Sequence, residues 1–143
     1  MNWKTTGFAQ QKKIFESLIE QDALSHAYIF QGPEQIGKKL FTQELFVKIN
    51  GRNKLDVTDP DLFIIAPKLA EDETKIYIED IRNLKTFLSL RPYYGPYQLV
   101  IIDDAHRLTP EASNAFLKLL EEPTGKVIFV LITSQPQELL STI

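Results

Sequence analysis

The residues best suited to chemistry are two adjacent acids, Asp103 and Asp104, and a glycine-containing segment with Gly32, Gly37 and Lys38. Gly32, four intervening residues, Gly37 and Lys38 have the spacing of a loop whose backbone N–H groups cradle phosphates, with the lysine reaching the outer ones. Paired acids at a strand end can hold magnesium and polarise a water molecule. Together the two motifs indicate nucleoside-triphosphate chemistry. Taken alone, the glycines could serve as a packing turn and the acids as a loop cap.

The residue after Lys38 departs from this pattern. A serine or threonine would ligate magnesium there, but the chain has Lys39, whose ammonium group cannot coordinate a cation. We therefore predict a P-loop fold with a damaged metal site and no bound metal. Gly32, Gly37, Lys38 and Lys39 are the residues expected to contact phosphates.

Both motifs lie where a strand ends. The aliphatic run Leu99–Ile102 precedes the two acids and predicts a strand buried on both faces of a parallel sheet, and Ala27–Phe30 is a shorter apolar run before the glycine segment. Ligands bind at the carboxyl edge of such sheets, so the two motifs should meet there. The prediction is a three-layer α/β core with strands at about 27–31, 61–65, 98–103 and 126–133.

Helical periodicity predicts helices within residues 7–24, 40–49, 76–90 and 109–122. The last begins with Thr109 as N-cap and Pro110 in the first helical position. Thr133 and Ser134 end the last predicted strand. Their hydroxyls could orient a phosphate-bound water or simply cap the strand, and both interpretations stay open.

Composition limits the functional classes. The chain has 143 residues, 43% of them hydrophobic, and a formal net charge of -3, which predicts one globular domain over residues 1–143 whose surface is not generally basic. There is no cysteine, so no disulfide or cysteine-based zinc site is expected. No export signal or long apolar run is evident, which predicts a cytoplasmic protein with no membrane partner. His26 and His106 lack ligand-spaced partners and are expected to pack or hydrogen-bond.

Several segments resemble the AAA+ clamp-loader subunits of bacterial DNA polymerase III, and together they extend over almost the whole chain. They are Ser25–Tyr28, Ile102–Thr109, Asn114–Pro123 and Tyr77–Pro92. The third, which reads N-A-F-L-K-L-L-E-E-P, is highly specific, and the fourth is most similar to the delta-prime subunit. The resemblance implies an AAA+ P-loop core that stops before the fifth strand, the arginine finger, the lid and the collar.

Two departures from the motor subunits (gamma and tau) favour a delta-prime-like subunit. Those subunits carry a hydroxyl residue where this chain has Lys39, and usually the longer Glu where it has Asp104. Gamma-type subunits, and some delta-prime chains, also carry zinc-binding cysteines after the P-loop helix, which this chain lacks. The resemblance therefore implies a scaffold that does not hydrolyse ATP itself, requires no cofactor and binds ATP or ADP weakly.

Residue by residue, the resemblance makes Asp103 the magnesium-side acid, Asp104 the water-polarising acid of a degenerate pair, and Thr133 and Ser134 the sensor region. The implied partners are gamma/tau and delta in a hetero-pentamer, with the sliding clamp and primer–template DNA contacted indirectly. Two alternatives remain: an active ATPase motor of the gamma/tau type, and an AAA+ nucleic-acid-binding adaptor outside replication.

Overall fold

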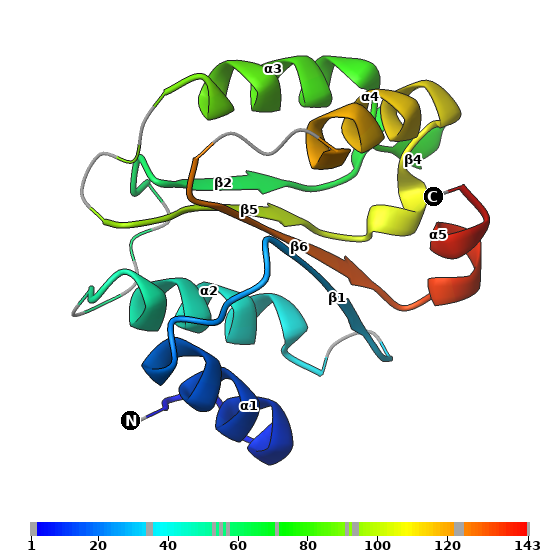
Figure 1. Ribbon diagram of the computed structural model, residues 1–143. Coiled ribbons are helices and arrows are strands. Elements are labelled where there is room, and N and C mark those ends of the chain that lie inside the picture. The colour runs from blue at the N-terminus through cyan, green and yellow to red at the C-terminus, as the bar shows by residue number, and fades with distance from the viewer. Residues whose placement is uncertain are drawn as a thin grey trace.

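The fold places helices on both faces of a parallel sheet (Figure 1). The computed structural model describes residues 3–33, 36–52, 54, 56, 58–70, 72–90, 92, 95–121 and 125–142. In this part of the chain the main sheet has four strands in the order β1-β6-β5-β2, and every pair is parallel. The predicted three-layer α/β architecture is confirmed.

The strands agree with the predicted ranges to within one residue at each end. They are β1 (Ala27–Gln31), β2 (Leu62–Ile65), β5 (Gln98–Ile102) and β6 (Val127–Thr133). Every residue of β5 and β6 is buried, as expected of central strands covered on both faces. Asp103 falls just outside β5, although its N–H still donates to the carbonyl of Ile65 at 2.8 Å. The acids are thus held at the carboxyl edge of the sheet.

The helices form the outer layers, with α3 (Ile78–Leu88) and α4 (Pro110–Glu121) on one face of the sheet and α2 (Lys38–Ile49) on the other. The first helix, α1 (Ala9–Glu20), packs outside α2, and α5 (Pro136–Thr142) lies against the 3-10 turn η1 (Ala105–Arg107) (Figure 1). As predicted, Thr109 caps α4, because its Oγ1 accepts the N–H of Ala112 at 3.1 Å.

A short hairpin, η1 and α5 were not predicted. The hairpin joins β3 (Lys68–Ala70) and β4 (Glu73–Lys75), which pair antiparallel outside the main sheet. Three-residue strands carry too little periodicity to be seen in the sequence. Asp72 and Glu73 are exposed, and Asp72 has a positive φ of 65° in the turn.

Separate apolar clusters hold the two faces of the sheet. On the side of α3 and α4, Phe116 packs edge-on against Phe129 of β6, with ring centroids 5.6 Å apart. On the other side, Phe41 of α2 is 1% exposed and its ring lies 5.8 Å from that of Phe30 in β1. Burying Phe-sized side chains stabilises a fold by about 1.5–3 kcal/mol each. This packing fixes α2 against β1. The glycine segment, which connects the end of β1 to the start of α2, is thereby held at the edge of the sheet.

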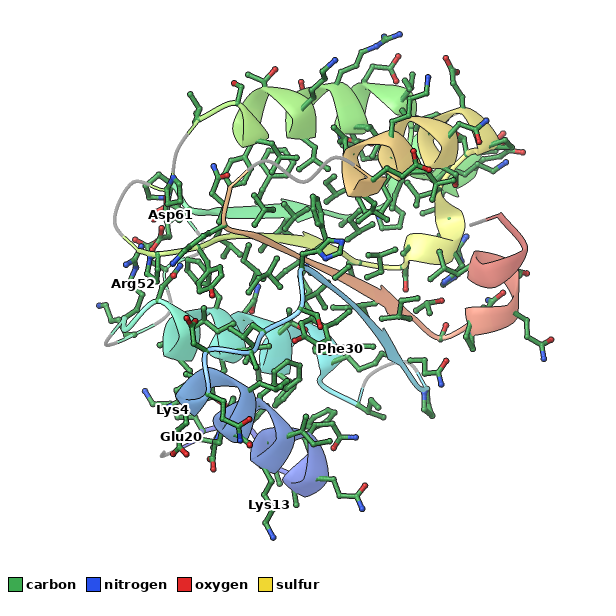
Figure 2. All side chains as sticks on the ribbon, in the orientation of Figure 1. Lys4, Lys13, Glu20, Phe30, Arg52 and Asp61 are labelled. Carbon is green, nitrogen blue, oxygen red and sulfur yellow. The ribbon has the colours of Figure 1, made fainter. Side chains whose placement is uncertain are left out.

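An ionic network closes the amino edge of the sheet. Arg52 donates to both oxygens of Asp59, at 2.7 and 3.3 Å, and to Asp61 at 3.0 Å. Asp61 also accepts the N–H of Gly95 at 3.0 Å. Figure 2 shows Arg52 and Asp61 together at the end of the sheet away from α5. The hydrogen bond to Asp59 raises the pKa of Arg52, burial opposes it, and Asp61 adds to the increase.

The amino-terminal segment is attached to α2 through Glu44. Its carboxylate accepts the N–H groups of Lys4 at 2.6 Å and Thr5 at 3.0 Å, and the Thr5 hydroxyl. Partial burial raises the pKa of Glu44, but the hydrogen bonds from Thr5 and Lys4 and the charge of Lys48 outweigh it. The pKa therefore lies below its ordinary value of 4.5. Ionised Glu44 thus stabilises the folded state.

We expect this contribution to be lost in acid. Because the folded pKa is lowered, the stabilisation is complete above pH 4.5 and disappears as the pH falls through the folded-state pKa. In Glu44→Gln, the decrease in the free energy of unfolding over this window should be smaller than in the unmodified chain. Urea titrations at pH 6 and at a series of pH values below 4.5 would measure this difference. Equal decreases in the free energy of unfolding of the two proteins would contradict the prediction.

Candidate functional site

A cleft of about 500 Å³ opens at the carboxyl edge of the sheet. It is lined by Gly37, Lys38, Lys39, Leu40, Gln43, Asp103, Asp104 and Ile132. The fold therefore brings the end of the glycine segment and the acidic pair to one site. The two motifs are distant in the sequence, but they meet here because the end of β5 and the start of α2 lie at the same edge of the sheet.

The glycine segment turns directly into α2. Gly37 has a φ of 90°, a left-handed conformation that glycine adopts without steric cost, and its carbonyl accepts the N–H of Phe41 at 2.8 Å. The first N–H groups of a helix have no partner within it, and the helix dipole favours anions near them. Gly32 lies at the other end of the segment, where its N–H donates to the carbonyl of Thr133 at 3.2 Å.

Lys38 is folded back over the glycine segment. Its side chain donates to the carbonyl oxygens of Gly32 and, at 2.8 Å, of Pro33, and the residue is only 8% exposed. The ammonium group is therefore held by two backbone carbonyls of the glycine segment, whose first glycine, Gly32, is not among the described residues that line the cleft. A phosphate that recruited Lys38 would have to draw it away from these two carbonyls.

Lys39 extends from the helix start toward the acids. Its Nζ lies 3.7 Å from Oδ2 of Asp103, and the side chains are 43% and 26% exposed. A P-loop site would hold Mg²⁺ here through a hydroxyl and a neighbouring carboxylate. The residues present do not fit that ion, because an ammonium group stands in place of the hydroxyl and is paired with the carboxylate. The described residues also contain no cluster of three or more His, Cys, Asp or Glu arranged for a metal.

Asp104 is the second acid of the cleft. Its backbone is left-handed, with a φ of 49°, and its carbonyl accepts the N–H of Arg107 at 2.9 Å to start η1. Asp is among the few residues that adopt this conformation readily. The position thus has a structural reason for a short acid, in addition to any role in the cleft.

The hydroxyl of Thr133 faces His106 rather than the cleft. Thr133 is fully buried, its Oγ1 lies 2.7 Å from Nδ1 of His106, and it accepts the N–H of Gln135 at 2.9 Å. The cleft is lined instead by the preceding residue, Ile132, while Ser134 is partly exposed. Of the two interpretations, this geometry favours the strand-end cap for Thr133, and it gives His106 a hydrogen-bonding role.

Three of the described cleft residues, Leu40, Gln43 and Ile132, were not predicted as site residues. Gln43 lies four positions after Lys39 and therefore on the same side of α2, and Leu40 is exposed over 55% of its surface at the rim. The helical spacing of four residues from Lys39 could have identified Gln43 as a cleft residue. The described residues of the lining include two lysines and two aspartates, whose formal charges sum to zero, so this part of the cleft is less cationic than a site with unpaired lysines.

Comparisons with known proteins agree with this geometry. A family model described as DNA polymerase III, delta subunit matches residues 7–143. DNA polymerase III subunit delta' of Bacillus subtilis (strain 168) is 34% identical over an alignment of 159 positions, which covers 100% of this chain and 47% of the relative. The chain thus spans about half the length of this curated relative. Several tau and gamma subunits also match most of the chain.

Solved structures support the fold. A gamma subunit-related protein of DNA polymerase III from Thermotoga maritima superposes with a TM-score of 0.71 at 31% identity, covering 90% of this chain and 42% of that one. The P-loop NTPase domain of a sigma-54 activator from E. coli shares the fold, with a TM-score of 0.51 at 12% identity, 95% of this chain and 84% of that one. The P-loop NTPase fold and the clamp-loader resemblance are confirmed, and the chain belongs to the delta-subunit family of DNA polymerase III, with a delta′ subunit among its relatives.

Proposed function

We propose that the chain serves as the AAA+ part of a delta′-type clamp-loader subunit. In this role it supports ATP-driven loading of the sliding clamp during DNA replication without hydrolysing ATP itself. Its direct partners are gamma/tau and delta, while the clamp and primer–template DNA are reached through the assembly.

The ion pair between Lys39 and Asp103 is the observation that supports a non-hydrolysing subunit. The catalytic arrangement of P-loop NTPases depends on a metal ion that bridges the outer phosphates and neutralises the developing charge. Here Lys39 stands in the position of the hydroxyl ligand, and its ammonium group is paired at 3.7 Å with Asp103, the carboxylate of the metal position. Phosphate binding by the glycine segment does not need that ion, so weak binding of ATP or ADP is compatible with this role.

The second candidate, an ATPase motor of the gamma/tau type, has one observation in its favour. The spacing of Gly32, Gly37 and Lys38 is intact, and tau and gamma subunits are among the relatives. It requires Lys39 to leave Asp103 and a metal ion to bind without the hydroxyl ligand. In the described part of the chain no other side chain replaces that ligand at the cleft. The nucleic-acid adaptor has no comparable support.

Assembly tests the proposal. The protein, mixed with tau/gamma and delta from the same organism, should form a complex that contains all three, as measured by size-exclusion chromatography with light scattering and mass spectrometry. Each protein alone and each pair serve as controls. A mixture in which tau/gamma and delta associate while this protein elutes separately would contradict the proposed role.

A further inference from the structure

The cleft already contains a cation of its own, the Lys39 ammonium group. It is covalently part of α2 and lies 3.7 Å from Oδ2 of Asp103, whose backbone N–H is fixed to Ile65 at the sheet edge. The pair is partly open to the cleft, since the side chains are 43% and 26% exposed. An anion entering the cleft would therefore meet this ammonium group where other P-loops present a metal ion.

Lys39 also disfavours a divalent ion at the same place. A cation bound to Asp103 would have to displace the ammonium group, and among the described residues that line the cleft the other carboxylate is that of Asp104, one residue away. It would also experience repulsion from Lys39, and like charges this close interact strongly at a partly buried site. Asp104, the other acid of the described lining, supplies one carboxylate against both effects.

The remaining lining suits phosphates that carry no metal. The N-terminus of α2 presents backbone N–H groups, Lys38 is buried beside it, and Lys39 stands opposite Asp103. A di- or triphosphate without a divalent ion has more negative charge than its magnesium complex. It therefore gains more from the two ammonium groups, and this gain has to offset the contacts that they give up, those of Lys38 with the carbonyls of Gly32 and Pro33 and that of Lys39 with Asp103.

We infer that this cleft binds di- and triphosphate groups in their metal-free form, with the Lys39 ammonium group in the place of the divalent cation. The ligand class is a nucleoside or inorganic polyphosphate that is not complexed with magnesium. This inference concerns binding at the cleft and goes beyond the proposed function. Its failure would leave assembly with tau/gamma and delta unaffected, so the two can be distinguished.

Isothermal titration of ATP and of tripolyphosphate tests it, each in EDTA and in excess Mg²⁺. The unmodified protein should bind ATP at least as tightly in EDTA as in Mg²⁺. Lys39→Met, which keeps the side-chain length and removes the charge, should lose about tenfold in affinity in EDTA. Lys39→Thr should reverse the preference and bind more tightly with Mg²⁺. Thermal melts check that both variants fold. We expect both to fold, because the Lys39 side chain is partly exposed.

Comparison of the ATP and tripolyphosphate titrations also identifies the ligand. ATP affinity well above that of tripolyphosphate indicates that the nucleoside contributes, and equal affinity indicates that the phosphate chain alone is recognised; either result supports the inference. Three results overturn it: about tenfold tighter binding of ATP in Mg²⁺ by the unmodified protein, unchanged affinity in Lys39→Met, or no binding of either probe.

Discussion

The purified protein should release phosphate from ATP no faster than its Lys38→Ala variant. Lys39 occupies the position of the metal-ligating hydroxyl and is paired with Asp103 at 3.7 Å, so the metal ion that neutralises charge in phosphoryl transfer has no site. Asp104, shorter by one methylene than the Glu usual in motor subunits, starts η1 with a left-handed backbone. P-loop NTPases that depend on an arginine from a neighbouring protein lose about 10³–10⁵ in rate without it, and the isolated protein has no such neighbour.

A coupled phosphate-release assay under saturating ATP and Mg²⁺ measures this directly. The Lys38→Ala variant provides the matched background, because it removes the phosphate-binding ammonium group and leaves Lys39 and both acids in place. Steady turnover by the unmodified protein above that background would show that the cleft is catalytic and would favour the motor of the gamma/tau type.

Replacing Arg52 should have the largest effect on stability. Arg52 is the cation between Asp59 and Asp61, whose side chains are 7% and 1% exposed. Arg52→Met keeps much of the side-chain bulk but leaves these two carboxylates close together without the guanidinium. Breaking a buried ionic pair by removing one partner costs about 3–5 kcal/mol. We expect a decrease of that size in the free energy of unfolding.

Arg82→Met is the control for the Arg52 substitution. Arg82 lies 3.9 Å from Glu79 in α3, both side chains are 69% exposed, and such surface pairs contribute about 0–1 kcal/mol. Urea denaturation at neutral pH should therefore separate the two variants clearly. Similar stabilities for Arg52→Met and Arg82→Met would mean that the network at the amino edge contributes little.

The sequence predicted the main sheet because its strongest signals are local. Leu99–Ile102 is a continuous aliphatic run that ends in acids, and the Gly32–Lys38 spacing lies between a strand and a helix, so each motif carried its own structural context. The parallel order of strands placed both at one edge. The cleft therefore could be expected before its dimensions were known.

Contacts between distant residues could not be predicted in the same way. Arg52 lies between predicted elements and Asp61 at the start of the predicted strand 61–65, and nothing in their spacing showed that they would form an ion pair. The hydrogen bond between His106 and Thr133 likewise depends on the positions of η1 and β6. The sensor role of Thr133 and Ser134 stays a prediction. Such pairings follow from the tertiary fold, which a pattern of residue types does not specify.

The most direct test of a non-hydrolysing clamp-loader subunit is a reconstituted loading reaction. Loading of the sliding clamp onto primed DNA and ATP turnover are measured with tau/gamma, delta and this protein, once with active tau/gamma and once with tau/gamma whose own P-loop lysine is replaced. We predict that loading requires this protein and that both loading and turnover disappear when tau/gamma is inactive, although this protein is unmodified. Loading that proceeds equally well without the protein, or ATP turnover that persists with inactive tau/gamma, would contradict the proposed role.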